Sequence, residues 1–330
     1  MQHSTCPRNP LHVLEFERPL YALREQLAQL AANTAEHPEC LAAARELENQ
    51  LAELQTKVYE NLSAAQVLQI ARHAERPHTS DLITGLAGAE GYQLLAGDRL
   101  GGEDQAIQAA LLRLVPELPA VLVIGTEKGR DIRAKQRHNF GMPQPWGYRK
   151  ARRLMQHAER FGLPVITLID TPGAYPGLEA EAQGQSIAIA ESIQVMAGLK
   201  VPTIAVITGE GGSGGALALG VADRVLMMQY AVYSVISPEG CAAILWRTRE
   251  QAATAARALK ITAPELQKLK LVDGCIPEPL GGAHQDPAAQ VATLRSTLIC
   301  ELTELLTVPA DQRLRARQQK FANYGFYEQK

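Results

Sequence analysis

Cysteine is scarce in this chain of 330 residues, and close cysteine pairs are absent. The cysteines are Cys6, Cys40, Cys241, Cys275 and Cys300. Because no two of them form a C-x-x-C motif, we expect neither a zinc ribbon nor another metal site in this chain. An odd number of scattered cysteines also provides no disulfide framework, which is typical of a reducing compartment.

Long apolar runs and a charge of one sign are missing as well. No apolar stretch approaches the roughly 18 residues that a membrane helix needs, and the first thirty residues lack the apolar core of a signal peptide. Lys and Arg number 33 against 35 Asp and Glu, a net charge of −2. This balance argues against a general nucleic-acid or membrane-surface binder. We therefore expect a cytoplasmic protein with neither a membrane nor a nucleic acid as its partner.

Apolar residues make up 46% of the chain, enough for a sizeable core. Residues 16–60 carry leucines at spacings of three and four, interrupted by the polar stretch 33–39. This pattern predicts two antiparallel helices, an arm that packs on its own domain or on another subunit.

From residue 120 onward, short apolar strands alternate with helices. The predicted strands are 120–125, 164–170, 201–208 and 223–237, and the predicted helices are 147–162, 179–199 and 214–222. Such alternation is typical of an α/β fold with parallel strands. Each strand ends in a loop rich in glycine or proline, where ligands bind in sheets of this kind. Residues 62–118 show no clear pattern.

The stretch TGEGGSGGALALG at 208–220 fits three kinds of site. Gly209, Gly211 and Gly214 satisfy the dinucleotide motif G-x-G-x-x-G. That motif also requires an acidic residue about 20 positions later to bind the ribose, and this region has none until Glu239. The dinucleotide interpretation is therefore weak.

A second interpretation is a nucleophile elbow, because Gly211, Ser213 and Gly215 satisfy G-x-S-x-G. The residues that would complete a hydrolase triad follow in the usual order: Asp223 or Asp273, then His284. Nothing in the sequence shows that His284 reaches the serine, so a Ser213-dependent acyl hydrolase remains an open alternative.

The third interpretation is an oxyanion site made by the backbone. Gly214 and Gly215 stand at the start of the predicted helix, where N–H groups have no helical partner. Glycine has no Cβ, so a substrate atom can approach these N–H groups closely. One well-placed donor stabilises a developing oxyanion by about 3–4 kcal/mol. This interpretation explains the glycine content best.

The loop DTPGAYPG at 170–177 has a similar composition and also follows a predicted strand. Asp170 can cap the turn through its carboxylate, and Gly173 and Gly177 permit a positive φ. Together with the glycine-rich stretch, this loop can form a cleft for a planar polar ligand. The alternative is that both loops are merely tight connections.

Residues 127–150 form the strongly basic segment of the chain. Lys128 and Arg130 are candidates for binding an anionic cofactor tail or an acidic partner surface. A solvated loop and helix face is an equally good interpretation.

Several long runs, in this order, resemble a known family. They include LIDTPGAYPG at 168–177, GEGGSGGALALG at 209–220 and YSVISPEGCAAILW at 233–246, and the resemblance extends over about 14–288. The chain resembles the carboxyltransferase alpha-subunit family of multi-subunit (bacterial and plastid) acetyl-CoA carboxylase.

The resemblance implies a crotonase-like α/β fold, a spiral of β-β-α units with an N-terminal helical arm. It implies an arm at 1–62, a carboxyltransferase domain at 63–290 and a C-terminal helix and tail at 291–330. It also implies an α2β2 tetramer with a beta subunit that carries the zinc, alongside a biotin carboxyl carrier protein and a biotin carboxylase. The implied reaction moves a carboxyl group from carboxybiotin on the carrier to acetyl-CoA, giving malonyl-CoA.

The resemblance further implies that Gly214 and Gly215 donate N–H groups to the ureido oxygen of biotin. The wall of the biotin cleft would comprise Gly173, Ala174, Gly211 and Gly212. Ser213 would then be structural.

Three departures from the family pattern are present. The segment 179–196 lacks a family arginine near Gln183 and an Asn-Leu-Arg run, alanines replace a glycine pair at 109–110, and His138 replaces an arginine. A non-catalytic or regulatory subunit of the same complex is therefore a further alternative.

Overall fold

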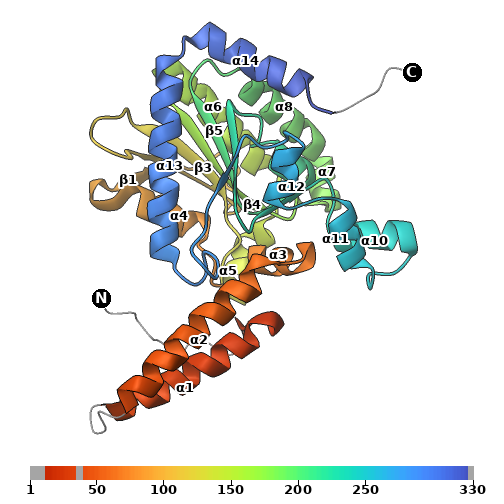
Figure 1. Ribbon diagram of the computed structural model, residues 1–330. Helices are drawn as coiled ribbons and strands as arrows, with labels where there is room; N and C mark the ends of the chain where they lie inside the picture. The colour runs from red at the N-terminus through yellow and green to blue at the C-terminus, as the bar shows by residue number, and fades with distance from the viewer. Residues whose placement is uncertain (1–11, 35–39, 326–330) are drawn as a thin grey trace.

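The computed structural model describes residues 12–34 and 40–325. A short 3-10 turn, η2 (Glu15–Glu17), leads into α1 (Arg18–Thr34), and α2 (Cys40–Glu60) packs along α1. The two helices form an arm that projects from the main body (Figure 1). The predicted helical hairpin is confirmed, although part of the predicted 33–39 connection lies outside the described residues.

A small apolar cluster joins the arm to the body. Leu20 of α1 and Tyr59 of α2 pack with Ile70 of α3 (Ala64–Ala71) and with Val232 of the sheet. Helix α3 begins at a capping box in which Ser63 accepts a hydrogen bond from the backbone of the third residue. The arm is thus fixed at its base by buried side chains.

Within the described residues, eight strands form one sheet in the order β1-β2-β3-β4-β5-β6-β8, with β7 paired to the end of β5. From β3 onward the neighbouring strands are parallel. The strands are β1 (Tyr92–Leu94), β2 (Ile107–Leu112), β3 (Val121–Thr126), β4 (Val165–Thr171), β5 (Thr203–Gly212), β6 (Arg224–Met228), β7 (Val232–Ser234) and β8 (Gly274–Ile276).

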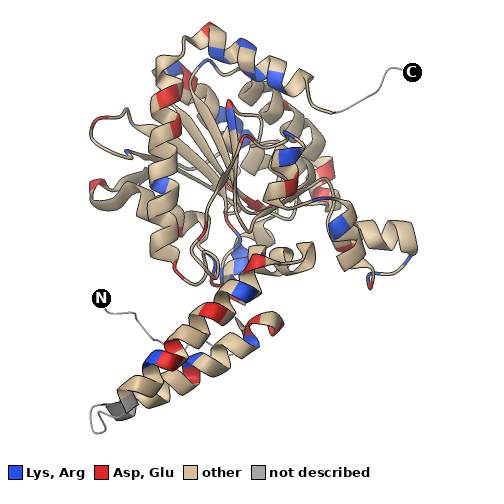
Figure 2. Ribbon diagram, in the orientation of Figure 1, with Lys and Arg blue, Asp and Glu red and all other residues tan. Residues whose placement is uncertain are grey.

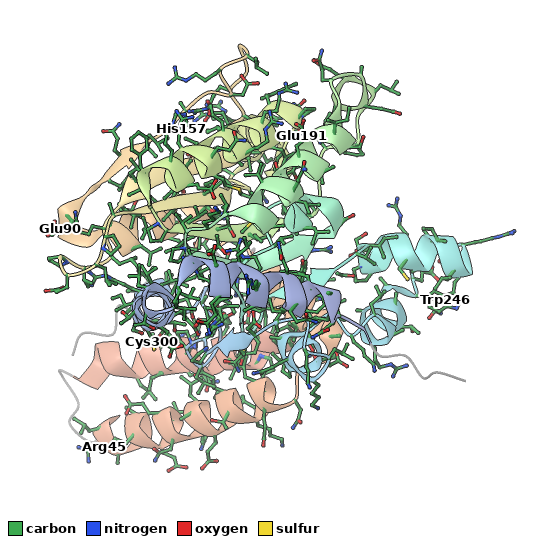
Figure 3. All side chains as sticks on the ribbon, turned by 90° about the horizontal axis from the view of Figure 1, so that it is seen from above. Arg45, Glu90, His157, Glu191, Trp246 and Cys300 are labelled. Atoms are coloured by element: carbon green, nitrogen blue, oxygen red, sulfur yellow. The ribbon has the colours of Figure 1, made fainter. Side chains whose placement is uncertain are left out.

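Helices cover both faces of the sheet. One layer contains α4 (Thr79–Ala87) and α13 (Pro287–Thr307), and the other contains α6 (Pro145–Phe161) and α8 (Gln185–Gly198). Seen from above, α13 with Cys300 and α6 with His157 lie on opposite sides (Figure 3). Four leucines of α13 belong to the same core as the central strands: Leu294, Leu298, Leu302 and Leu305. The predicted boundary at 290 falls inside α13, and the domain division stays a prediction.

Seven further helices occur among the described residues. They are α5 (Ile132–Arg137), α7 (Leu178–Ala182), α9 (Ser213–Leu217), α10 (Pro238–Trp246), α11 (Ala252–Ala258), α12 (Ala263–Lys268) and α14 (Ala310–Ala322), with the short turns η3 (Gly88–Glu90) and η4 (Asn139–Gly141). Acidic and basic residues are interleaved over the arm and the body (Figure 2). No helix within 12–34 and 40–325 combines the length and the apolar character that a membrane crossing demands.

The structure corrects four predicted elements. The helix expected at 214–222 is shorter, because α9 ends at Leu217. The helix expected at 179–199 is divided into α7 and α8, because Gly184 adopts a left-handed φ of +79°. The strand expected at 223–237 is two strands, β6 and β7. Strand β5 continues to Gly212, so the first glycines of the glycine-rich stretch lie in a strand rather than in a turn.

Candidate functional site

The site is built where the pairing of β4 and β5 changes register. The pairing is regular as far as Ile169 and Ile207 and resumes at Thr171 and Gly211. Asp170 on β4 therefore stands opposite three residues of β5, which makes a bulge. This bulge carries the end of β5 away from its earlier path and sets the direction in which α9 begins.

Asp170 holds the bulge together through its carboxylate. Its Oδ1 accepts a hydrogen bond of 2.8 Å from the backbone N–H of Glu210. A Cβ on Gly209 would lie 2.3 Å from the same oxygen, so only glycine fits there. The sequence predicts that Asp170 caps a turn. In the structure this aspartate bridges two strands instead.

The two glycine-containing loops touch through their backbones. A Cβ on Gly212 would lie 2.2 Å from the carbonyl oxygen of Pro172, and a Cβ on Gly215 would lie 2.4 Å from the backbone nitrogen of Ala174. Gly173 adopts a φ of +147°. The two loops are thus neighbours, as the parallel strands predicted, and they approach too closely for larger residues.

Gly214 differs from the glycines on either side. It is only half-buried, and the nearest atom to a Cβ built on it is the Cγ2 of Ile189 at 3.7 Å, an ordinary contact. Packing within this chain therefore does not require glycine here. By contrast, Gly211 is buried beneath the ring of Tyr233, so it supports the turn rather than facing outward.

Tyr148 of α6 lies under the turn, and no sequence pattern indicates this position. Its hydroxyl lies 2.9 Å from the position of a Cβ on Gly215. The side chain is fully buried, and its hydroxyl has no hydrogen-bond partner among the described residues. Burial and the charge of Asp104 raise the pKa of Tyr148 well above its usual value, so the hydroxyl keeps its proton.

A pair of cations faces the carboxylates behind the turn. The Nζ of Lys128 lies 2.7 Å from both Asp170 and Glu210. Burial alone would lower the pKa of Lys128, but the two carboxylates outweigh it and raise the pKa. Arg72, at the end of α3, binds Glu210 from another side at 2.7 Å. No local sequence signal indicated Arg72, because 138 positions separate it from Glu210.

The structure separates the two basic candidates. Lys128 lies behind the glycine turn, whereas Arg130 forms an exposed ion pair with Asp81 of α4 at 2.5 Å. Lys128 is thus already matched by two carboxylates and is not a vacant anion site.

A catalytic triad around Ser213 is not assembled. Ser213 is exposed at a φ of +52°, a strained strand-to-helix turn of the kind that an elbow uses. However, Asp223 precedes β6, Asp273 precedes β8, and Ser213 follows β5. Because these strands are parallel, the aspartates lie at the opposite edge of the sheet from the serine. His284 is fully buried and its Nε2 lies 3.1 Å from Glu17.

One group of potential metal ligands occurs among the described residues, comprising Glu17, His73 and His284. In His73, Nε2 donates to the carbonyl oxygen of His12 at 2.7 Å, and Nδ1 accepts from the backbone N–H of Glu75 at 3.1 Å. Both nitrogens are therefore occupied, and no lone pair remains for a metal ion. This group instead ties the base of the arm to the body.

Several solved structures share this fold. The chain resembles a Pseudomonas malonate decarboxylase hetero-tetramer (TM-score 0.56, 18% identity, 72% of this chain and 92% of that chain). It also resembles transcarboxylase 12S (TM-score 0.55, 21% identity, 69% of this chain and 42% of that chain). The geranyl-CoA carboxylase beta subunit of P. aeruginosa is similar (TM-score 0.54, 18% identity, 76% and 46%). These likenesses confirm the crotonase-like fold.

Sequence comparisons identify the family. The model described as acetyl co-enzyme A carboxylase carboxyltransferase-like matches residues 13–325. The carboxyl transferase subunit alpha of acetyl-coenzyme A carboxylase from Edwardsiella ictaluri is 49% identical over 96% of this chain and 99% of its own length. The subunit of the same name from Escherichia coli is 48% identical over the same shares. The chain therefore belongs to the family of acetyl-CoA carboxylase carboxyltransferase alpha subunits.

Proposed function

We propose that this chain is the alpha subunit of a carboxyltransferase that moves the carboxyl group of carboxybiotin, held on a carrier protein, to acetyl-CoA. The product is malonyl-CoA for fatty acid synthesis. Membership of the family supports this reaction. We choose this site because the position of Gly214 is open, whereas packing requires the neighbouring glycines.

The backbone N–H groups of Gly214 and Gly215 are the proposed oxyanion donors. They lie in the first turn of α9, where N–H groups have no partner within the helix. Carboxybiotin is a substrate that supplies the carboxyl group. As that group departs, negative charge grows on an oxygen, and fixed donors in a site shielded from water stabilise this charge more than water does.

The proposed cleft wall comprises Gly173, Ala174 and Gly212, whose backbones meet behind the donors. Gln185 of α8 supports this wall, because its Nε2 donates to the carbonyl oxygens of Pro143 and Tyr175. The helix that departs from the family pattern thus still begins with a side chain that holds the loop. This contact favours the catalytic subunit over the non-catalytic alternative.

Exposed apolar side chains near the turn support a partner subunit. Ile187 of α8, which adjoins α9, is 63% exposed, and Leu178 of α7, which adjoins α8, is 84% exposed. Helix α10 exposes Ile244 and Leu245, and Trp246 at its end projects from the body (Figure 3). We propose that a beta subunit covers these side chains in an α2β2 tetramer.

Other partners follow from the proposed reaction. The carrier protein and a biotin carboxylase would supply carboxybiotin, and zinc would belong to the beta subunit. Of the two basic candidates for an anionic substrate tail or a partner, we keep Arg130, because Lys128 is matched by two carboxylates. The cytoplasmic location stays a prediction.

The reverse reaction tests the proposal. Malonyl-CoA and free biocytin are incubated with this chain alone, with a zinc-ribbon beta subunit alone, and with both, and acetyl-CoA release is followed. Turnover in the mixture alone is the expected result. A stable complex of the two chains without turnover would contradict the proposal and favour the non-catalytic alternative.

A further inference from the structure

Two negative charges lie directly behind the proposed oxyanion turn. Glu210 is three residues before Ser213, and Asp170 lies opposite it in the bulge. Their side chains are only 11% and 9% exposed, so water screens them weakly. Left uncompensated, these carboxylates would oppose the growth of negative charge on a substrate at the turn.

Each oxygen of the Glu210 carboxylate is bound by a different cation. The Nε of Arg72 donates to Oε1 at 2.7 Å, and the Nζ of Lys128 donates to Oε2 at 2.7 Å. Lys128 also binds Asp170 at 2.7 Å. Both carboxylates are therefore bound directly by a cation. The pKa of Glu210 agrees with this arrangement, since burial would raise it but the two cations lower it overall.

Arg72 also reaches a second structural element. Its Nη1 and Nη2 donate to the two carboxylate oxygens of Glu239 at 2.6 and 3.3 Å. Glu239 lies in the first turn of α10, which Ser237 caps. One guanidinium thus joins the end of α3, the strand before the glycine turn and the start of the helix that exposes apolar side chains.

We propose that Arg72 is a positioning residue for the oxyanion turn, which it serves by neutralising Glu210 and by tying β5 to the start of α10. This inference rests on the proposed function. Removal of Arg72 leaves Glu210 partly uncompensated beside the donors and frees α10 from the turn. The rate of carboxyl transfer falls, while the KM for the acyl-CoA changes little.

The test replaces Arg72 by methionine in the complete complex with the beta subunit. We expect kcat of the reverse reaction to fall roughly tenfold, the size expected for one uncompensated charge near the site, with the KM for malonyl-CoA within about twofold. Arg224→Met is a matched control. The side chains of Arg72 and Arg224 are 35% and 38% exposed, and Arg224 faces two glutamates at the opposite edge of the sheet.

A rescue experiment separates charge neutralisation from a merely structural contact. In the Arg72→Met background, Glu210→Gln removes the uncompensated charge, and we expect the double variant to recover most of the lost kcat. Arg72→Lys keeps the charge and should retain more activity than Arg72→Met. If Arg72→Met does not assemble, Arg72→Gln, which also removes the charge, and its double variant with Glu210→Gln carry the same test.

Three outcomes are decisive. Equal kcat for Arg72→Met, Arg224→Met and the wild type would overturn the inference. A double variant as slow as Arg72→Met, or slower, would overturn charge neutralisation. Turnover of the wild-type complex is measured in the same assay. An inactive wild-type complex would contradict the proposed function itself, rather than the role of Arg72 alone.

Discussion

The two edges of the parallel sheet use charged residues in opposite ways. At the amino edge, Asp223 binds Arg317 through both oxygens at 2.8 and 2.9 Å, and both side chains are almost fully buried. Thr203 adds two further hydrogen bonds to the same carboxylate. At the carboxyl edge, Asp170 and Glu210 are also paired, but they lie behind a turn of bare backbone.

The amino edge of the sheet therefore contributes mainly to stability, whereas the carboxyl edge carries the proposed active site. At the amino edge α14 covers the pair, and Arg317 and Asp223 bind each other directly. At the carboxyl edge, Gly214 is open, and the buried hydroxyl of Tyr148 has no hydrogen-bond partner within 12–34 and 40–325. Buried groups left unsatisfied are costly, and they are kept mostly where function requires them.

Asp223→Ala is expected to have the largest effect on stability. It leaves the guanidinium of Arg317 buried without its carboxylate, which costs about 3–5 kcal/mol of unfolding free energy. Urea unfolding measures this loss. Glu301→Ala, which removes a partly exposed partner of Arg224, is the control and should cost no more than about 1 kcal/mol. Equal losses for the two variants would contradict the comparison of the edges.

His73 makes the base of the arm sensitive to acid. Burial and the neighbouring His284 lower the pKa of His73 to about 4. Between pH 6.5 and 4 the unfolded chain therefore binds a proton that the folded chain does not, so stability falls as the pH falls, by up to about 3 kcal/mol. His73→Gln should remove this part of the dependence. Urea unfolding at pH 7 and pH 4.5 tests it, and an unchanged pH dependence in the variant would refute it.

Gly215→Ala probes the contact between the two loops. Its Cβ would lie 2.4 Å from the backbone nitrogen of Ala174, so the backbone must shift, at a cost of about 1–3 kcal/mol. A lower melting temperature is the expected result. Gly214→Ala, a change at the preceding residue, is the matched control and should have the melting temperature of the wild type. A Gly215→Ala variant with wild-type stability would show that the loops are not in close contact.

Ser213→Ala is expected to have the smallest effect. The side chain is exposed and the candidate triad residues are engaged elsewhere, so turnover of the assembled complex should stay within about twofold of the wild type. The isolated chain should also not react with a fluorophosphonate probe. Labelling that Ser213→Ala abolishes would support the hydrolase alternative instead.

Much of the architecture could be predicted from local patterns. Apolar runs rich in Val and Ile identified the central strands, and leucine spacing identified the arm. Because β4 and β5 are parallel neighbours, the loops after them had to lie side by side. The adjacency of the 170–177 loop and the glycine-rich stretch could therefore be predicted from the sequence.

The parts that escaped prediction depend on contacts between distant residues. Strand β5 extends through glycines that disfavour strands, because Asp170 and the pairing with β7 hold that segment extended. Arg72 and Tyr148 carry no motif of their own, and only the folded chain brings them to the turn. The predicted triad failed for the same reason, since order along the chain does not show which edge of the sheet a residue occupies.

The most direct test of the account is the turnover of Gly214→Ala in the assembled complex. A Cβ at this position meets only Ile189 at 3.7 Å within the chain, so folding and assembly should be unchanged. Because the same Cβ crowds the oxygen that the turn is proposed to bind, kcat should fall roughly 100-fold. A variant that folds, assembles and turns over at the wild-type rate would contradict the assignment of this turn as the oxyanion site.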